Sequence, residues 1–229
     1  MNPNEETSIR LGGDWTTPKS ERLSQAWFNA MALEHKLSDH VKWMHGMSGK
    51  KFRYLLNSLV ELTPNARYLE IGSWAGSTAC SAMYGNSGKV TCIENWEHFG
   101  GPRDQFNQNV NLSINSNINL QLIEEDFRKV DYTNIGKYNI YMYDGPHSLE
   151  DQYDGLMIVQ SALDDMYTLI VDDWNQANDV RAGTYKALEE LGHEVIASID
   201  IITASDANIS ITHERSDWHN GYFIAVIKK

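Results

Sequence analysis

In the first third of the chain, apolar residues recur at the spacing of a helix. Between Glu21 and Met44 they fall at steps of three, four or seven positions, which predicts one helix or two shorter ones. The pattern repeats from Phe52 to Val60 and stops before the turn-forming pair Pro64-Asn65. Residues 1–20 are mostly polar and contain paired glycines, and we expect them to form a mobile arm. Residues 21–65 are therefore expected to form a helical cap.

After residue 65, short apolar runs alternate with segments of helix length. The seven runs cover residues 68–72, 89–94, 120–124, 139–144, 167–172, 194–202 and 221–227. Helical patterns between the first six lie near residues 78–84, 105–112, 149–163 and 180–191, with a weaker connection at 127–137. This alternation predicts a parallel sheet with helices on both faces. The polar loop 203–220 joins the last two runs and predicts a hairpin. The expected fold of residues 66–229 is α/β: a doubly wound, Rossmann-like sheet of seven mostly parallel strands with an antiparallel last strand.

The charge of the chain narrows the classes of partner. It has 19 basic and 31 acidic residues and a net charge of −12. This balance gives no general attraction to phosphate backbones or anionic lipid, so we expect neither nucleic acid nor a membrane as partner. Cys80 and Cys92 are too few for a disulfide framework, and we expect reduced core thiols. The first 30 residues lack the pattern of a signal peptide, which predicts a cytoplasmic protein.

Acidic residues follow the predicted strands one after another. Ligands of open α/β sheets bind beyond the carboxyl ends of the strands, so these positions are the candidates for chemistry. The first five runs end in Glu70-Ile71-Gly72, Glu94, Glu124-Glu125-Asp126, Asp144-Gly145-Pro146-His147 and Asp172-Asp173. Any one of these acids could be a solvated loop residue, but their occurrence in register indicates a binding site.

The first strand runs into a glycine turn, with the pattern E-x-G-x-x-x-G from Glu70 to Gly76. It matches neither the dinucleotide fingerprint nor a phosphate-binding loop. An acid beside this turn disfavours a pyrophosphate and suits a cationic ligand. Glu94 stands 22 positions after Gly72, where nucleotide-binding sheets carry a carboxylate for the ribose, and Asp126 could accept from an adenine amine. The alternative for the turn is a tight strand–helix connection without a ligand.

Six segments give the sequence a resemblance to a known family. They are WMHGMSGKK (43–51), LEIGSWAGST (69–78), IENW (93–96), EEDF (124–127), YDGPHS (143–148) and IVDDWN (170–175). Over about residues 40–229 the chain resembles the class I S-adenosylmethionine (SAM)-dependent methyltransferases. Within them it is most similar to the metal-dependent O-methyltransferases of the catechol, caffeoyl-CoA and macrocin types. Its Asp-Gly-x-His-Ser segment is similar to a looser branch that includes cephalosporin hydroxylase-like proteins.

The resemblance implies the residues that would bind SAM. They are Met47, Glu70, Gly72, Trp74, Gly76, Thr78, Glu94, Trp96, Asp126, Phe127 and Asp144. The turn at 72–78 would line the methionine end, Glu94 would hold the ribose, and Asp126-Phe127 would border the adenine. Met47 belongs to a stretch that would fold over the cofactor. Trp96 could replace a ring that the catechol type carries where this chain has Gly145.

A metal site is predicted from three aspartates. Asp172 and Asp173 stand 28 and 29 positions after Asp144, at the end of the adjacent strand. Three converging carboxylates repel one another unless a cation lies among them. Oxygen ligands suit Mg²⁺ or another hard divalent cation rather than zinc, and the resembling family holds Mg²⁺ with such a set. The alternative is that Asp172 or Asp173 caps the next helix and Asp144 binds only the amine of SAM.

His147 is the candidate general base. It lies three positions after Asp144, where the catechol and caffeoyl-CoA types carry a lysine that is thought to take the substrate proton. The alternative is a loop histidine that binds only the backbone. The loop 203–220 would add substrate contacts, and its candidates are His213, Glu214, Arg215, Asp217, Trp218 and His219.

These observations predict a SAM-dependent methyltransferase that transfers a methyl group, assisted by Mg²⁺, to a hydroxyl of a small molecule such as a diol, a catechol or a sugar. Two alternatives stay open: a metal-free methyltransferase acting on nitrogen or carbon, and a SAM-binding protein without catalysis. The oligomeric state stays open, and a homodimer is one possibility because dimers are the commonest oligomers.

Overall fold

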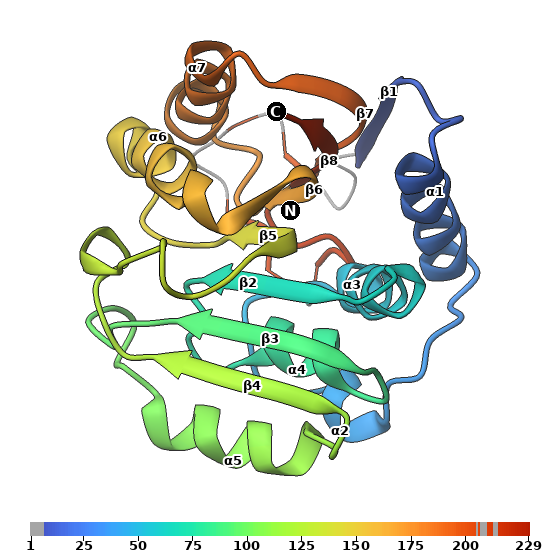
Figure 1. Ribbon diagram of the computed structural model, residues 1–229. Coiled ribbons are helices and arrows are strands. Elements are labelled where there is room, and N and C mark those ends of the chain that lie inside the picture. Colours follow the sequence, from blue (N-terminus) through green and yellow to red (C-terminus); the bar gives the residue numbers. More distant parts are fainter. Residues whose placement is uncertain (1–6, 205, 207–209, 213–214) are drawn as a thin grey trace.

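The strands expected after residue 65 lie in one mixed sheet. The computed structural model describes residues 7–204, 206, 210–212 and 215–229, and within them the sheet has eight strands in the order β1-β7-β8-β6-β5-β2-β3-β4 (Figure 1). The strands are β1 (Ser8–Gly13), β2 (Arg67–Ile71), β3 (Gly88–Ile93), β4 (Ile118–Ile123), β5 (Tyr138–Tyr143), β6 (Leu163–Val171), β7 (Glu194–Ile202) and β8 (Tyr222–Lys228).

The expected fold class is confirmed. Strands β4, β3, β2, β5 and β6 pair in parallel, which follows from the helical connections between them. Strand β8 is antiparallel to both β6 and β7, as the hairpin pattern predicts. The chain order reverses between β2 and β5, so the crevice beyond these two strands is the topological switch point at which ligands bind in such sheets.

The expected number of strands was wrong by one, and most of the expected mobile arm is ordered. Strand β1 pairs antiparallel with β7, from Ser8 opposite Ile202 to Gly13 opposite Ala197. Gly13 has a φ of 83°, and a Cβ there would lie 2.1 Å from the carbonyl oxygen of Ile196, so the chain needs glycine at this approach. The next helix begins at Pro18 after a capping box, because the hydroxyl of Thr17 accepts from the backbone of Ser20.

Two layers of helices cover the sheet. Helices α1 (Pro18–Met31), α3 (Lys50–Leu62), α4 (Ser77–Met83) and α5 (Arg103–Ser113) share one buried cluster, with the short α2 (Asp39–Lys42) beside α4. Helices α6 (Leu149–Met157) and α7 (Ala182–Leu191) pack on the other face with the turns η1 (Phe127–Lys129) and η2 (Ile158–Ala162) and the π-helical turn η3 (Ala177–Arg181). Figure 1 shows α6 and α7 on the side of the sheet opposite α1 and α3. Each layer of helices buries one face of the sheet, and this packing holds the ends of the strands in place.

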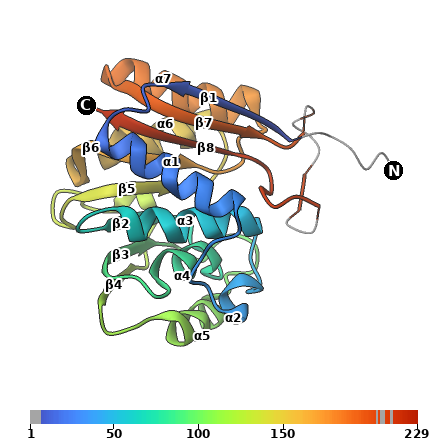
Figure 2. The same cartoon turned by 90° about the vertical axis from the view of Figure 1, so that its right-hand side faces the viewer.

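Two segments far apart in sequence meet at one end of the molecule. The chain before α3 and the described residues that directly precede β8 both lie at the right of Figure 2. The backbone N–H groups of Lys51 and Phe52 donate to the carbonyl oxygen of Asp217, at 3.1 and 3.4 Å. A Cβ on Gly49 would lie 2.1 Å from the same oxygen, so only glycine allows this contact. Among the residues described, none of the helices has the length and apolar character needed to cross a bilayer.

Candidate active site

The turn from β2 into α4 has the geometry of a binding loop. Gly72 and Gly76 have φ values of 87° and 84°, and Trp74 between them is also left-handed at 42°. A Cβ on Gly72 would lie 1.9 Å from the carbonyl oxygen of Asp144, so the loop passes directly against the end of β5. The backbone N–H of Trp74 donates to Oε2 of Glu94 at 2.8 Å, which ties the loop to the end of β3.

Glu70 supports the loop from within the sheet. The sequence placed it beside the turn as a group facing the ligand, but it lies in β2 and is completely buried. Its carboxylate accepts from the hydroxyls of Tyr68 and, at 2.8 Å, Thr78. Burial outweighs these hydrogen bonds and raises the pKa of Glu70 to about 7. The side chains of Glu70 and Thr78 therefore anchor the first turn of α4 rather than the open crevice.

Glu94 joins two turns at the end of β3. Its Oε1 accepts from the backbone N–H of Trp96 at 2.9 Å, while Oε2 accepts from Trp74. Each carboxylate oxygen has a second lone pair, so Glu94 can also accept hydrogen bonds from ribose hydroxyls, as the sequence predicts. The indole of Trp96 meets Phe106 edge-on, with ring centroids 5.5 Å apart, and its Nε1 donates to Glu124 at 3.0 Å. Trp96 thereby lies between the ends of β3 and β4.

Asp126 and Phe127, which the sequence places at the adenine, have different surroundings in the structure. Oδ1 of Asp126 accepts from the backbone N–H of Arg128 at 3.0 Å and caps η1. The Phe127 side chain is only 6% exposed and meets Tyr143 edge-on in the core cluster below. Asp126 is half-buried at the surface, so of the two it has the side chain that a ligand can reach.

Three acidic residues and a histidine gather where β5 and β6 end. The backbone N–H of Asp172 donates to Tyr143, which brings the segments after the two strands together, and the N–H of Asp173 donates to Oδ1 of Asp172 at 2.8 Å. Nε2 of His147 lies 2.8 Å from Oδ2 of Asp173. One ligand atom each from Asp144, His147 and Asp173 lie within 4.8 Å of one another.

The carboxyl groups of this cluster have pKa values that are shifted in opposite directions. Burial, and then the charges of Asp172 and Asp173, raise the pKa of Asp144 well above its ordinary value, and its carboxyl shares a hydrogen bond with Asp172. Burial also raises the pKa of Asp172. Burial raises the pKa of Asp173, whereas its hydrogen bonds lower it. The bonds from His147 and Asn220 prevail, so the pKa of Asp173 lies below its ordinary value. Burial lowers the pKa of the His147 imidazole, but the hydrogen bond to Asp173 and the charges of Asp173, Asp172 and Asp151 together outweigh burial and raise this pKa.

The expected ligand set and the observed cluster differ in one member. The sequence named Asp144, Asp172 and Asp173, whereas the residues whose ligand atoms converge are Asp144, His147 and Asp173. Asp172 lies next to them, 4% exposed, and its Oδ1 is used by the backbone of Asp173. The helix-cap alternative is not what the structure shows, because the N-cap of η3 is Gln176.

Two polar residues of this region were missed in the sequence. Nδ2 of Asn220 donates to Oδ1 of Asp173 at 2.6 Å, and its own Oδ1 accepts from the backbone of Ile211 at 2.7 Å. Arg53 is 2% exposed and donates to Ser48 and to the carbonyl groups of Val41, Lys42 and Met44. The turn signal Asn220-Gly221 could have pointed to the first, whereas no local signal marks the second.

The segment 43–49 lies against the glycine loop. Oγ of Ser48 and Oγ of Ser77 are 3.0 Å apart, and the rings of His45 and Trp74 are separated by 5.2 Å. Met47 of this segment is 39% exposed.

The loop residues named from the sequence have different surroundings. Arg215 and Asp217 line a cavity with the segment before α3, Trp218 stacks on Trp27, and His219 is buried. His213 and Glu214 lie outside the described residues.

Comparison with known proteins gives structural but not sequence matches. No family model matches the chain, and no curated protein is similar to it in sequence. An O-methyltransferase from Bacillus cereus, solved in complex with SAH, is 15% identical and has a TM-score of 0.55, and the match covers 91% of both chains. The O-methyltransferase TomG from Streptomyces achromogenes, involved in tomaymycin synthesis and solved with SAM, is 14% identical with a TM-score of 0.53. That match covers 91% of this chain and 90% of TomG. TrmN from Thermus thermophilus is 13% identical with a TM-score of 0.53 over 82% of this chain, but the chain spans only 51% of TrmN.

At these identities the likeness shows the fold. The chain has the fold of the class I SAM-dependent methyltransferases and resembles solved O-methyltransferases in structure, which confirms this part of the resemblance inferred from the motifs.

Proposed function

We propose that the protein is a SAM-dependent methyltransferase that acts on a hydroxyl of a small molecule with the help of a divalent cation. The observation that carries the proposal is the convergence at the switch point. Three features lie at the carboxyl ends of neighbouring strands, along one edge of the sheet. They are the left-handed glycine loop after β2, the carboxylate of Glu94 after β3, and the Asp144–His147–Asp173 cluster after β5 and β6. Two proteins of the same fold and nearly the same length are O-methyltransferases solved with SAM or SAH.

In this proposal the methionine end of SAM lies over the turn at 72–78, which Glu70 and Thr78 brace from below. Glu94 takes the ribose hydroxyls, and Trp96 and Asp126 border the adenine beside the backbone of Phe127. Met47 and its neighbours cover the cofactor, and Asp144 receives the amine. The acidic surroundings favour the sulfonium cation of SAM electrostatically.

The cluster also fits a hard divalent cation. Asp144 and Asp173 would hold it, with either Asp172 or His147 as the neighbouring third group. Burial and mutual repulsion disfavour the charged forms of Asp144 and Asp172, as their raised pKa values show, and a cation bound among them would stabilise those charged forms. When bound, Mg²⁺ would act as a Lewis acid that lowers the pKa of the acceptor hydroxyl.

In this proposal His147 takes the acceptor proton. Its side chain is 34% exposed, so a substrate can reach it, and the adjacent carboxylate of Asp173 stabilises the protonated imidazole. As the O–C bond forms, the C–S bond of the sulfonium breaks, its electron pair stays on sulfur, and the hydroxyl proton passes to His147. SAH leaves as a neutral thioether, so charge and atoms balance without a further reactant.

A second candidate is a methyltransferase that needs no metal. The observation in its favour is the ion pair between His147 and Asp173, which already neutralises the ionised member of the cluster. In that case Asp144 would serve the cofactor alone.

Turnover measured as SAH release separates the two candidates. We expect a panel of diols, catechols and sugars to contain an acceptor whose turnover falls at least about tenfold in the presence of a chelator and in Asp144→Asn. The matched control Asp165→Asn removes an exposed acid at the other end of β6 and should retain the wild-type rate. In His147→Gln the decline of the rate at acidic pH should disappear. Turnover indifferent to chelation would favour the metal-free candidate.

A further inference from the structure

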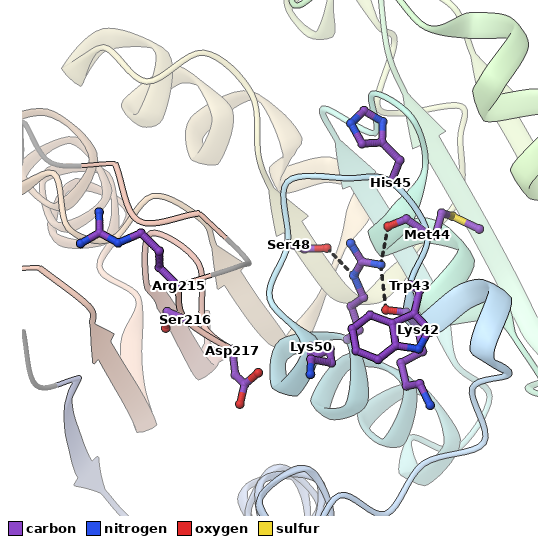
Figure 3. Close-up of a pocket in the computed structure, with 10 residues that line it drawn as sticks. Lys42, Trp43, Met44, His45, Ser48, Lys50, Arg215, Ser216 and Asp217 are labelled. Carbon is purple, nitrogen blue, oxygen red and sulfur yellow. Dashed lines mark hydrogen bonds between the residues drawn. The ribbon is translucent and has the colours of Figure 1, made fainter. Parts of the chain in front are cut away.

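A cavity of about 570 Å³ lies between the chain that precedes α3 and the loop that precedes β8. Figure 3 shows Lys42, Trp43 and Lys50 on one side of it and Arg215 and Asp217 on the other. Its volume falls in the range of roughly 300–1,000 Å³ that is typical of small-molecule sites. It is therefore large enough for an acceptor of modest size.

The cavity adjoins the proposed active site through both of its walls. On one wall, Ser48 is hydrogen-bonded to Ser77 of the glycine loop. The other wall, Arg215 to Asp217, leads within three residues to Asn220, which donates to Asp173. A molecule in the cavity thus lies between the segment proposed to cover SAM and the loop that contacts the catalytic cluster.

The lining of the cavity is positive although the chain as a whole has a net charge of −12. Among the lining residues that the structure describes, Lys42, Lys50, Arg215 and the buried Arg53 stand against one acid, Asp217. This concentration of cations attracts an anion to the cavity although the protein as a whole is acidic.

Two of these cations have no acidic partner within the part of the chain that the structure describes. Lys42 pairs with Asp39 at 2.5 Å, and Asp217 is 3.7 Å from Lys51. No ion pair joins Lys50 or Arg215 to any of the residues that the structure describes. Both are therefore available to a ligand.

An exposed aromatic ring completes the lining. The indole of Trp43 is 64% exposed, and Nζ of Lys50 lies 4.5 Å from its centroid. A planar or apolar part of a ligand can pack on such a ring while its charged end pairs with the nearby ammonium group.

We infer that the acceptor is an acidic small molecule, with a carboxylate or phosphate attracted by the cations that line the cavity, Lys50 and Arg215 among them, its body against Trp43, and its reacting hydroxyl directed at the Asp144–His147–Asp173 cluster. This inference rests on the proposed methyltransferase function and adds the charge class of the acceptor.

Matched acceptor pairs that differ only in charge test the inference. 3,4-Dihydroxybenzoate is compared with 3,4-dihydroxybenzamide, and glucose 6-phosphate with glucose, which distinguishes a carboxylate from a phosphate. Initial rates of SAH formation are measured for the wild type, for Lys50→Glu/Arg215→Glu, and for the milder Lys50→Gln/Arg215→Gln. The control Lys186→Glu makes the same charge change at an exposed position on α7. Calorimetric titration of SAH is run on every variant.

We expect the wild type to turn over the anionic member of at least one pair with a kcat/KM at least about tenfold higher than its neutral counterpart. Two exposed cations that attract the same anionic acceptor together supply enough binding free energy for a tenfold preference. The reversed variant should lose this preference, the neutralised variant should lose part of it, and Lys186→Glu should keep the wild-type preference and rates.

Three results would overturn the inference while SAH binding to the wild type upholds the cofactor assignment. They are equal kcat/KM for both members of every pair, absence of turnover for all anionic members, and weaker SAH binding in the reversed variant, which would assign the cations to the cofactor. Absence of SAH binding to the wild type would instead refute the proposed function.

Discussion

The buried carboxyl of Glu70 should make the stability of the protein depend on pH in a direction opposite to that of most acids. Its folded pKa is raised from the ordinary 4.5 to about 7, chiefly by burial. The stabilisation that this difference provides is fully present below pH 4.5, and it is lost as the pH rises through 7, because the unfolded chain releases the proton first.

The size of the effect follows from the shift in proton affinity, in which a tenfold change is worth about 1.4 kcal/mol. Between pH 5.5 and 8.5, a range above the isoelectric point near 5.0, Glu70 should remove about 2 kcal/mol of stability. Glu70→Gln keeps the shape and the acceptor for Thr78 but does not titrate. We therefore expect the unfolding free energy of the wild type minus that of Glu70→Gln to fall by about 2 kcal/mol over this range.

Urea unfolding of both proteins at a series of pH values measures this difference directly. Glu189→Gln, which removes an exposed carboxyl on α7, controls for the change in net charge. A difference between wild type and Glu70→Gln that stays constant with pH, within about 0.5 kcal/mol, would refute the argument that burial holds a proton on Glu70.

Other predictions concern the loop and the residues around it. Gly72→Ala places a Cβ 1.9 Å from backbone at a φ of 87°, and it should cost more than about 3 kcal/mol in urea unfolding, whereas Gly192→Ala, at a φ of 66° with open space around it, should cost about 1 kcal/mol. Equal costs would mean that the loop can move away from Asp144. The buried hydroxyl of Tyr222 has no hydrogen-bond partner among the described residues, so Tyr222→Phe should leave stability unchanged or raise it by up to about 1 kcal/mol. A clear loss of stability in Tyr222→Phe would show that this hydroxyl is bonded in solution.

The elements of the sheet could be predicted from the sequence because they depend on local pattern. Runs such as 139–144 and 167–172 are almost wholly apolar, as parallel strands covered on both faces must be, and each ends at a visible acid. The positions of Asp144 and Asp173 at one edge then follow from topology alone.

Strand β1 could not be predicted because its pairing uses mainly the backbone. Most of its residues are exposed, Leu11 among them at 59%, so no buried face imposes an alternating pattern on the sequence. Its hydrogen bonds to β7 join residues nearly two hundred positions apart, and backbone groups carry no sequence signal for such a partner.

The polar contacts of the site were harder to anticipate for a related reason. In the sequence Glu70 stands beside the glycine turn like a group that faces a ligand, but its position in β2 turns it toward Tyr68 and the interior. Arg53 and Asn220 acquire their roles only when α3 and the last loop come together above the sheet. Such side chains are determined by tertiary packing, which a single sequence does not display.

The central claim is that SAM binds over the glycine loop with Glu94 at the ribose. Calorimetric titration of SAH into the wild type and into Glu94→Gln tests it most directly. We predict micromolar binding to the wild type and a loss of about tenfold to a hundredfold in Glu94→Gln, since a hydrogen bond to a charged group contributes about 1.5–3 kcal/mol. Absence of binding to the wild type, or equal affinity for both proteins, would contradict the account.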